Sequence, residues 1–110
     1  MNIKITTATS LSIGGSTVTN VVGYFTQNLK QNAQNELTGS VNLEWYLSST
    51  DKNADKDPVW ILDNNGKKIT TAFITLTAQE TAAAGLPVTI YNKVAEAVEA
   101  MITGSTVVVE

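Results

Sequence analysis

The chain has 110 residues, of which 43% are hydrophobic and only 15% are charged, and its net charge is -3. This length and composition favour one globular domain with a single core over a disordered chain. Cysteine, histidine and arginine are absent, which excludes disulfides, thiolate chemistry, a histidine general base and bidentate recognition of phosphate or guanine.

Several classes of function become improbable as a result. Zinc or iron would have to bind through carboxylates alone, which these metals rarely accept. The lysines are dispersed, so no basic surface for nucleic acid is expected. No apolar run approaches the roughly 20 residues of a membrane helix, and the first residues lack the apolar core of a signal peptide. We therefore expect a non-enzymatic chain without cofactors and without nucleic-acid or membrane partners.

The first third of the chain predicts a hairpin. Residues 2–8 begin with Ile3 and Ile5 between polar neighbours, which predicts a short strand, and Leu11 and Ile13 repeat the alternation. Residues 17–26 are rich in β-branched side chains, which also favours a strand. Gly14 and Gly15 lie between these segments, where a tight turn can adopt positive φ. One face of this hairpin would carry Val18, Val22 and Tyr24.

Residues 27–36 consist mostly of amide side chains and have too little apolar area to anchor themselves. Three interpretations stay open: a solvated connector, a loose helical turn, and a polar arm that becomes ordered only against a partner. If the segment is an arm, Gln27, Gln31 and Gln34 are candidate interface residues.

Residues 37–48 organise the rest of the chain. Apolar side chains fall on odd positions and polar ones on even positions, which predicts a strand with one dry face in an antiparallel sheet. We therefore expect Trp45 to be buried and Glu44 to be exposed. The predicted inward row is Leu37, Val41, Leu43, Trp45 and Leu47, with a gap at Gly39.

A polar loop is expected over residues 49–58. Within it, residues 51–57 place oxygen ligands on alternate positions, as a calcium loop does. Lys56 stands where the sharp turn requires glycine, however, and Leu62 stands where a bidentate glutamate should be. We therefore predict a solvated loop and no metal site.

A second hairpin is expected around Asn65 and Gly66, the dipeptide typical of a two-residue type I′ turn. Its strands would be residues 59–63 and 67–77. The core face would then carry Trp60 and Leu62, with Ala72, Ile74 and Leu76 opposite. If Trp60 is instead exposed, it could stack on a sugar ring.

Two helices are expected next. Thr77 and Glu80 have the spacing of a capping box, which predicts a short helix over residues 78–84 that ends at Gly85. A longer helix should follow Pro87, with surface carboxylates at Glu96 and Glu99 that have no catalytic role. Its apolar stripe comprises Ile90, Tyr91, Val94, Ala95, Val98, Met101 and Ile102.

The chain closes with Val107, Val108 and Val109, which abandon one-sided alternation and predict a terminal strand that is dry on both faces. Such a strand lies either within the protein's own core or against another subunit. These valines are therefore further candidate interface residues.

The order of these elements, with the segments LTGSVNLEWYLS, DNNGKK and TAQE, resembles the small structural subunits of tailed-phage virions, namely neck, connector, tail or head-decoration proteins. The resemblance lies in the general character and order of the elements and extends over the whole chain. It implies a virion protein assembled in the host cytoplasm, which forms homo-oligomers and contacts other structural proteins through sheet edges and the amide-rich segment. No functional residue can be carried over.

We therefore expect an α+β fold, in which an antiparallel sheet carries a capped amphipathic C-terminal helix on one face, followed by a short terminal strand. The expected function is that of a structural assembly subunit. The first alternative is a small module that binds carbohydrate or a cell surface through Trp60 and the polar loops, and another is a regulatory partner of an enzyme. Outside a virion, we expect a cytoplasmic location.

Overall fold

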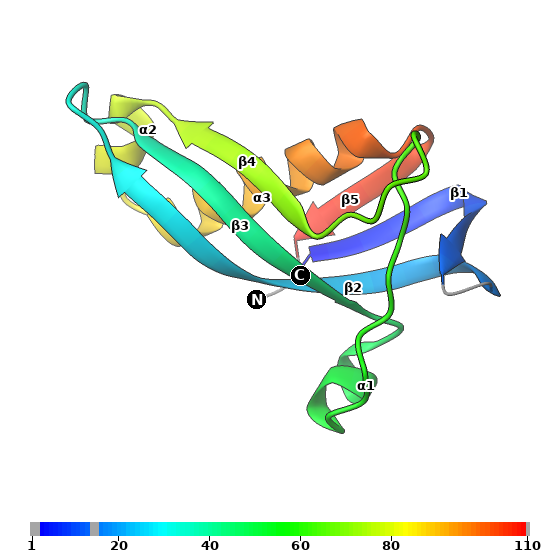
Figure 1. Ribbon diagram of the computed structural model, residues 1–110. Coiled ribbons are helices and arrows are strands. Elements are labelled where there is room, and N and C mark those ends of the chain that lie inside the picture. Colours follow the sequence, from blue (N-terminus) through cyan, green and yellow to red (C-terminus); the bar gives the residue numbers. More distant parts are fainter. Residues whose placement is uncertain (1–2, 14–15, 110) are drawn as a thin grey trace.

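A five-stranded antiparallel sheet with the strand order β4-β3-β2-β1-β5 forms the framework of the computed structural model (Figure 1). The structure describes the backbone of residues 3–13 and 16–109 and the side chains of residues 20–109. The strands are β1 (Ile3–Ile13), β2 (Ser16–Gln31), β3 (Leu37–Tyr46), β4 (Thr71–Leu76) and β5 (Ser105–Val109). The helices are α1 (Ser49–Asn53), α2 (Ala78–Ala82) and α3 (Leu86–Met101).

The long helix α3 covers one face of this sheet and packs on β4 and β5, which confirms the predicted α+β fold (Figure 1). We call the covered side the helix face and the other side the open face. The predicted apolar stripe of α3 supplies four buried residues, Ile90, Val94, Ala95 and Val98. Opposite them, the buried hydrophobic side chains of the strands on the helix face are Val21, Val41, Leu43, Trp45, Ala72, Ile74, Leu76 and Val107.

The predicted faces of β3 are confirmed in its centre. Trp45 is 2% exposed and its indole N–H donates to the carbonyl of Ile69 at 2.8 Å, whereas Glu44 is exposed. The strand ends at Tyr46, so the expectation that Leu47 points inward is wrong, and Leu47 is 46% exposed. Tyr46 was expected in the polar row but is buried. The ring of Tyr24 packs edge-on against it, and the ammonium of Lys52 of α1 lies over it.

Gly39 interrupts the apolar row of β3 for a reason of backbone geometry. Its φ is +150°, and a Cβ atom there would lie 2.3 Å from the carbonyl oxygen of Asn28 on β2. Since real side chains cannot adopt this contact without a backbone shift, the close approach of β2 and β3 requires glycine at this position.

The amide-rich segment of residues 27–36 is neither an arm nor a helical turn. Residues 27–31 belong to β2 and pair with β3. The backbone hydrogen bonds of this pairing hold the segment in place, although its polar side chains do not anchor it. The side-chain oxygen of Asn32 accepts the N–H groups of Gln34 and Glu36, both at 3.0 Å, and Asn35 takes a positive φ of 62°. The segment therefore completes β2 and forms its turn into β3.

The first predicted hairpin is also present: Ile13 of β1 is paired with Ser16 of β2, and the turn at residues 14–15 lies outside the described residues. β1 is longer than predicted and has an irregular register between Thr6 and Leu11. Of the three residues assigned to one face, Val22 and Tyr24 lie on the open face opposite Tyr46 and Glu44 of β3, and the side chain of Val18 is not among those described.

The second predicted hairpin exists, but its turn and register differ from the prediction. Asp63 N–H donates to Lys67 O at 2.8 Å, and the Asp63 carboxylate accepts the N–H groups of Asn65 and Lys67. Only Gly66 takes positive φ, so the loop has three residues instead of a type I′ pair. It repeats the geometry of the β2–β3 turn, with Asp63 in the place of Asn32.

The prediction of which side chains of this hairpin point inward is wrong by one residue. Ile61 is fully buried, whereas Trp60 is 47% exposed and Leu62 only partly buried. Trp60 and Leu62 therefore do not form the expected core row. Ala72, Ile74 and Leu76 of β4 are buried as predicted.

Both predicted helices are present. The capping box is present with both bonds, and it starts α2, which ends at Ala82. α3 begins after Gly85, whose φ is +80°, with Pro87 in its first turn and without a side-chain cap. The expected polar loop contains the short helix α1, because the hydroxyl of Ser48 accepts the N–H of Asp51 and caps it.

Candidate interaction surfaces

The two sets of predicted interface residues lie in different parts of the molecule. Gln27 and Gln31 are exposed on β2, an interior strand, and Gln34 is exposed in the β2–β3 turn. The terminal valines lie on β5, at one outer edge of the sheet, far from that turn (Figure 1). The structure therefore does not bring the two sets together into one surface.

β5 is an edge strand with one buried and one open side. Val107 is 8% exposed beneath α3, but Val108 is 44% exposed on the open face. The prediction of a strand that is dry on both faces is therefore wrong for the chain by itself, since α3 covers only one face. A hollow of about 410 Å³, which we call the β5 groove, runs between this strand and α3. A smaller hollow of about 330 Å³ lies on the open face near α1. The β5 groove is lined by Asn92, Ala95, Glu96, Glu99, Val107, Val108 and Val109.

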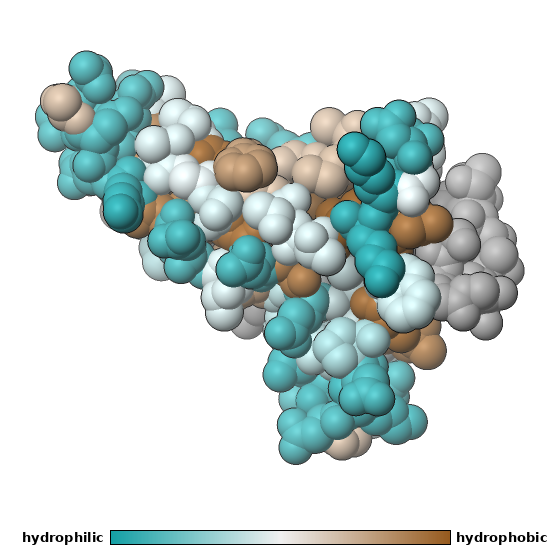
Figure 2. Space-filling model, in the orientation of Figure 1, coloured by the Kyte–Doolittle hydropathy of each residue, from teal (hydrophilic) through white to brown (hydrophobic). Residues whose placement is uncertain are grey.

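β4 forms the opposite edge of the sheet, and no described strand pairs with its outer side. Its sequence TAFITL contains no charged residue. Phe73 projects from the open face and is 77% exposed, more than any other large hydrophobic side chain among those described. Figure 2 shows a hydrophobic group that stands over β4 among pale and teal side chains.

Phe73 was not singled out from the sequence, although a signal for it exists. Thr71, Phe73 and Thr75 alternate with Ala72 and the other inward residues of β4. Once the inward row was predicted, the remaining row contained one large aromatic side chain on a polar face. Phe73 gains its interest from its place on an edge strand, unpaired on its outer side among the described residues, where another chain can add a strand.

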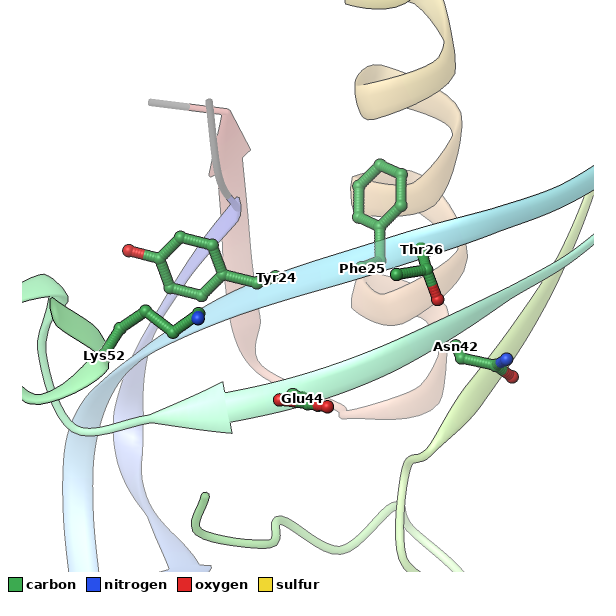
Figure 3. A pocket seen from close by; sticks show the side chains of 6 residues that line it. All are labelled: Tyr24, Phe25, Thr26, Asn42, Glu44 and Lys52. Carbon is green, nitrogen blue, oxygen red and sulfur yellow. The ribbon is translucent and has the colours of Figure 1, made fainter. Parts of the chain in front are cut away.

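The smaller hollow lies on the open face where α1 meets the sheet (Figure 3). Thr26 of β2 and Asn42 of β3 contribute to its lining, and Lys52 reaches from α1 toward the ring of Tyr24. The Lys52 ammonium lies 5.7 Å from the centre of that ring and 5.6 Å from the centre of the Tyr46 ring. This arrangement anchors α1 on the sheet through cation–π contacts.

Glu44, which lines this hollow, is hydrogen-bonded to the neighbouring Tyr46. The Tyr46 hydroxyl donates to the Glu44 carboxylate at 2.8 Å. This hydrogen bond, together with burial, raises the pKa of Tyr46 above its usual value of 10.0. A hydroxyl held in its protonated form is a poor base or nucleophile, so the pair is better suited to a structural role.

The carboxylate of Glu80 caps α2, whereas Glu96 and Glu99 line the hollow between α3 and β5. Glu80 accepts the backbone N–H of Thr77 at 3.0 Å, which holds the pKa of this carboxyl below its usual range. It also lies 3.4 Å from the ammonium of Lys93. Glu96 and Glu99 are exposed beside the β5 groove. Glu80 is thus a helix cap, and the other two give the groove an acidic rim.

The calcium-like segment of residues 51–57 is split between α1 and the residues after it. The carboxylate of Asp51 lies 3.6 Å from the ammonium of Lys56. Among the described residues, no group of three or more acidic side chains could together hold a metal ion. That the segment binds no calcium stays a prediction, and calorimetric titration with calcium is its test.

Trp60 lies on the surface of the second hairpin. The ammonium of Lys68 lies 4.2 Å from the centre of its ring, a close cation–π contact. The lysine occupies one face of the indole. A ligand that stacks on Trp60 would have to use the other face or displace Lys68.

Comparison of the chain with protein-family models, curated proteins and solved structures found no match. Within the described part of the chain, none of the helices combines the length and the apolar character needed to cross a bilayer. The surfaces described above are therefore the basis for the functional proposals.

Proposed function

We propose that this chain is a non-enzymatic structural subunit that assembles with copies of itself and with other structural proteins. The setting implied by the sequence resemblance is the virion of a tailed phage. In this function the protein acts through protein–protein contacts and needs no cofactor. The contacts are made chiefly by the edges of the sheet.

The observation that carries the proposal is that both outer strands of the sheet lack a partner on their outer sides, as far as the described residues extend. An unpaired edge presents a row of backbone N–H and C=O groups that readily accept another strand. Each edge also carries an exposed hydrophobic side chain on the open face, Phe73 on β4 and Val108 on β5. Backbone pairing and apolar contact are thus available at the same places.

Substituting one exposed residue on each edge tests this function. We expect Phe73→Lys or Val108→Lys, or both, to reduce assembly measured by sedimentation, because a charge at the contact must be desolvated. Both side chains are exposed, so each variant should keep the parent's circular dichroism spectrum. Val88→Lys is the matched control, since Val88 is 47% exposed on α3 and does not belong to a sheet edge.

Two outcomes would contradict the proposal. One is that Val88→Lys reduces assembly as much as the edge variants, which would make the effect one of net charge. The other is that the parent is monomeric at every concentration and neither edge variant changes its behaviour. Unfolding of Val108→Lys would instead assign the terminal strand to the core of the protein alone.

A second candidate function is favoured by the 47% exposure of Trp60. Exposed indole rings can stack on sugars, so the chain could be a module that binds carbohydrate or a cell surface. Binding to a glycan array that is lost in Trp60→Ala would support this function. Absence of binding by the parent would remove it.

A further inference from the structure

We propose that the outer edge of β4 pairs with β4 of a second copy, antiparallel and around a two-fold axis at Phe73. The inference rests on the proposed assembly function and names the partner and the symmetry of one contact. It would join the two five-stranded sheets into one continuous sheet.

The hydrogen bonds of the sheet determine which backbone groups of β4 are free. Leu43 N–H of β3 donates to Thr70 O at 2.8 Å. In an antiparallel ladder, bonded pairs alternate with non-bonded ones, and the register places Thr71 at the next, non-bonded position. The N–H and C=O groups of Thr71, Phe73 and Thr75 therefore point away from β3, toward the outer edge.

This outward row is complementary to itself. It contains Thr71, Phe73 and Thr75, and the order threonine, phenylalanine, threonine is the same in both directions. In an antiparallel pair centred on Phe73, that residue lies opposite its equivalent, and Thr71 lies opposite Thr75 of the second copy. Each of these pairs can exchange both N–H···O bonds, and the side chains form aromatic and threonine cross-strand pairs on the open face.

The charges around the strand are compatible with this symmetry. Lys67 and Lys68 precede β4 in the chain, and Glu80 follows it. The Lys68 ammonium already lies over Trp60, and Glu80 already pairs with Lys93. An antiparallel arrangement brings the basic end of one strand near the acidic end of the other, so it places no like charges together. β4 also lacks the charged side chains and prolines by which edge strands commonly avoid pairing.

β5 is less suited to the same arrangement. Its groove is lined by Glu96 and Glu99 of α3. A symmetric β5 pair would bring Glu96 and Glu99 toward their equivalents in the second copy, and like charges brought together are destabilising. Self-pairing is therefore assigned to β4.

Introduced cysteines test the pairing directly, because the parent chain contains none. Residues opposite each other in a bonded antiparallel pair have Cα atoms about 5.5 Å apart, within the range that a disulfide spans. Under mild oxidation we expect Phe73→Cys to give a covalent dimer. A variant carrying both Thr71→Cys and Thr75→Cys should also do so while it retains Phe73.

Two variants serve as controls. Thr75→Cys alone should stay monomeric on a denaturing gel, because it faces Thr71 of the second copy and is about 13 Å along the strand from its own equivalent. Val108→Cys, on the other edge, should also stay monomeric. Circular dichroism of each reduced variant checks that it is folded.

The outcomes separate this inference from the proposed function. Preferential cross-linking of Val108→Cys would overturn the β4 pairing and leave assembly through β5. Equal cross-linking of Thr75→Cys alone and the double variant would show random collision and would also overturn it. If no variant cross-links while the parent still assembles, only the inference fails; if the parent is always monomeric, both fail.

Discussion

The two faces of the sheet carry two large aromatic residues in opposite environments. Trp45 on the helix face is 2% exposed, whereas Phe73 on the open face is 77% exposed. α3 covers the first face, and the second is mostly threonine, serine and asparagine. The residues that hold the fold together and those available for contact are therefore largely separate in this protein. Substitutions can test the two roles independently.

The largest effect on stability is expected on the helix face. Trp45→Ala should lower the free energy of unfolding by about 3–5 kcal/mol, the usual range for a large buried aromatic residue. It also leaves the carbonyl of Ile69 without the indole N–H that it accepts at 2.8 Å. Denaturant titration at a protein concentration too low for association measures this change.

Glu44→Gln is the matched control, because Glu44 is the preceding residue and lies on the opposite face. It should change the free energy of unfolding by far less than Trp45→Ala. The reverse order of severity would mean that the two faces of β3 are interchanged.

A smaller, pH-dependent effect is expected on the open face. Tyr46→Phe removes the hydrogen bond to Glu44 and should cost about 1 kcal/mol near neutral pH. The pKa of Tyr46 is raised above 10.0 in the folded protein. The stabilisation is therefore fully present below about pH 10 and is lost as the pH rises through the folded-state pKa.

Urea unfolding of the parent and Tyr46→Phe, each at neutral and at strongly alkaline pH, checks this prediction. The difference between the two proteins should shrink as the tyrosine ionises. A difference that does not change with pH would mean that the Tyr46–Glu44 hydrogen bond contributes nothing measurable.

The smallest effect is expected for the second tryptophan. Trp60→Ala should lower the free energy of unfolding by no more than about 1 kcal/mol, because its main described contact is the exposed cation–π pair with Lys68. Thermal unfolding of Trp60→Ala beside Trp45→Ala makes the comparison. Similar losses in the two variants would show that Trp60 belongs to the core.

The elements with the clearest periodicity were predictable from sequence. Alternation in the middle of β3 identified Trp45 as buried, and the spacing of apolar residues in α3 identified its inward stripe. The Thr77 capping box was recognisable because its two hydrogen bonds require particular residue types at a fixed spacing. Each of these signals is local in the chain.

The remaining features depended on long-range pairing. Residues 27–31 form a strand because β3 supplies their hydrogen bonds, not because their amide side chains favour one. Ile61 rather than Trp60 points inward because the three-residue turn fixes the register of that hairpin. The position of Phe73 and Val108 on the two edges depends on the order of strands in the sheet, and that order was not predicted.

Sedimentation of the parent chain over a wide concentration range, at low and high salt, tests the central claim most directly. The claim is that the sheet edges assemble the protein through backbone pairing and apolar contact. It predicts that the mass rises with concentration above the 11.7 kDa of one chain, by the same amount at both salt concentrations, because salt mainly screens exposed charges. A mass of one chain at every concentration, or association that disappears at high salt, would contradict it.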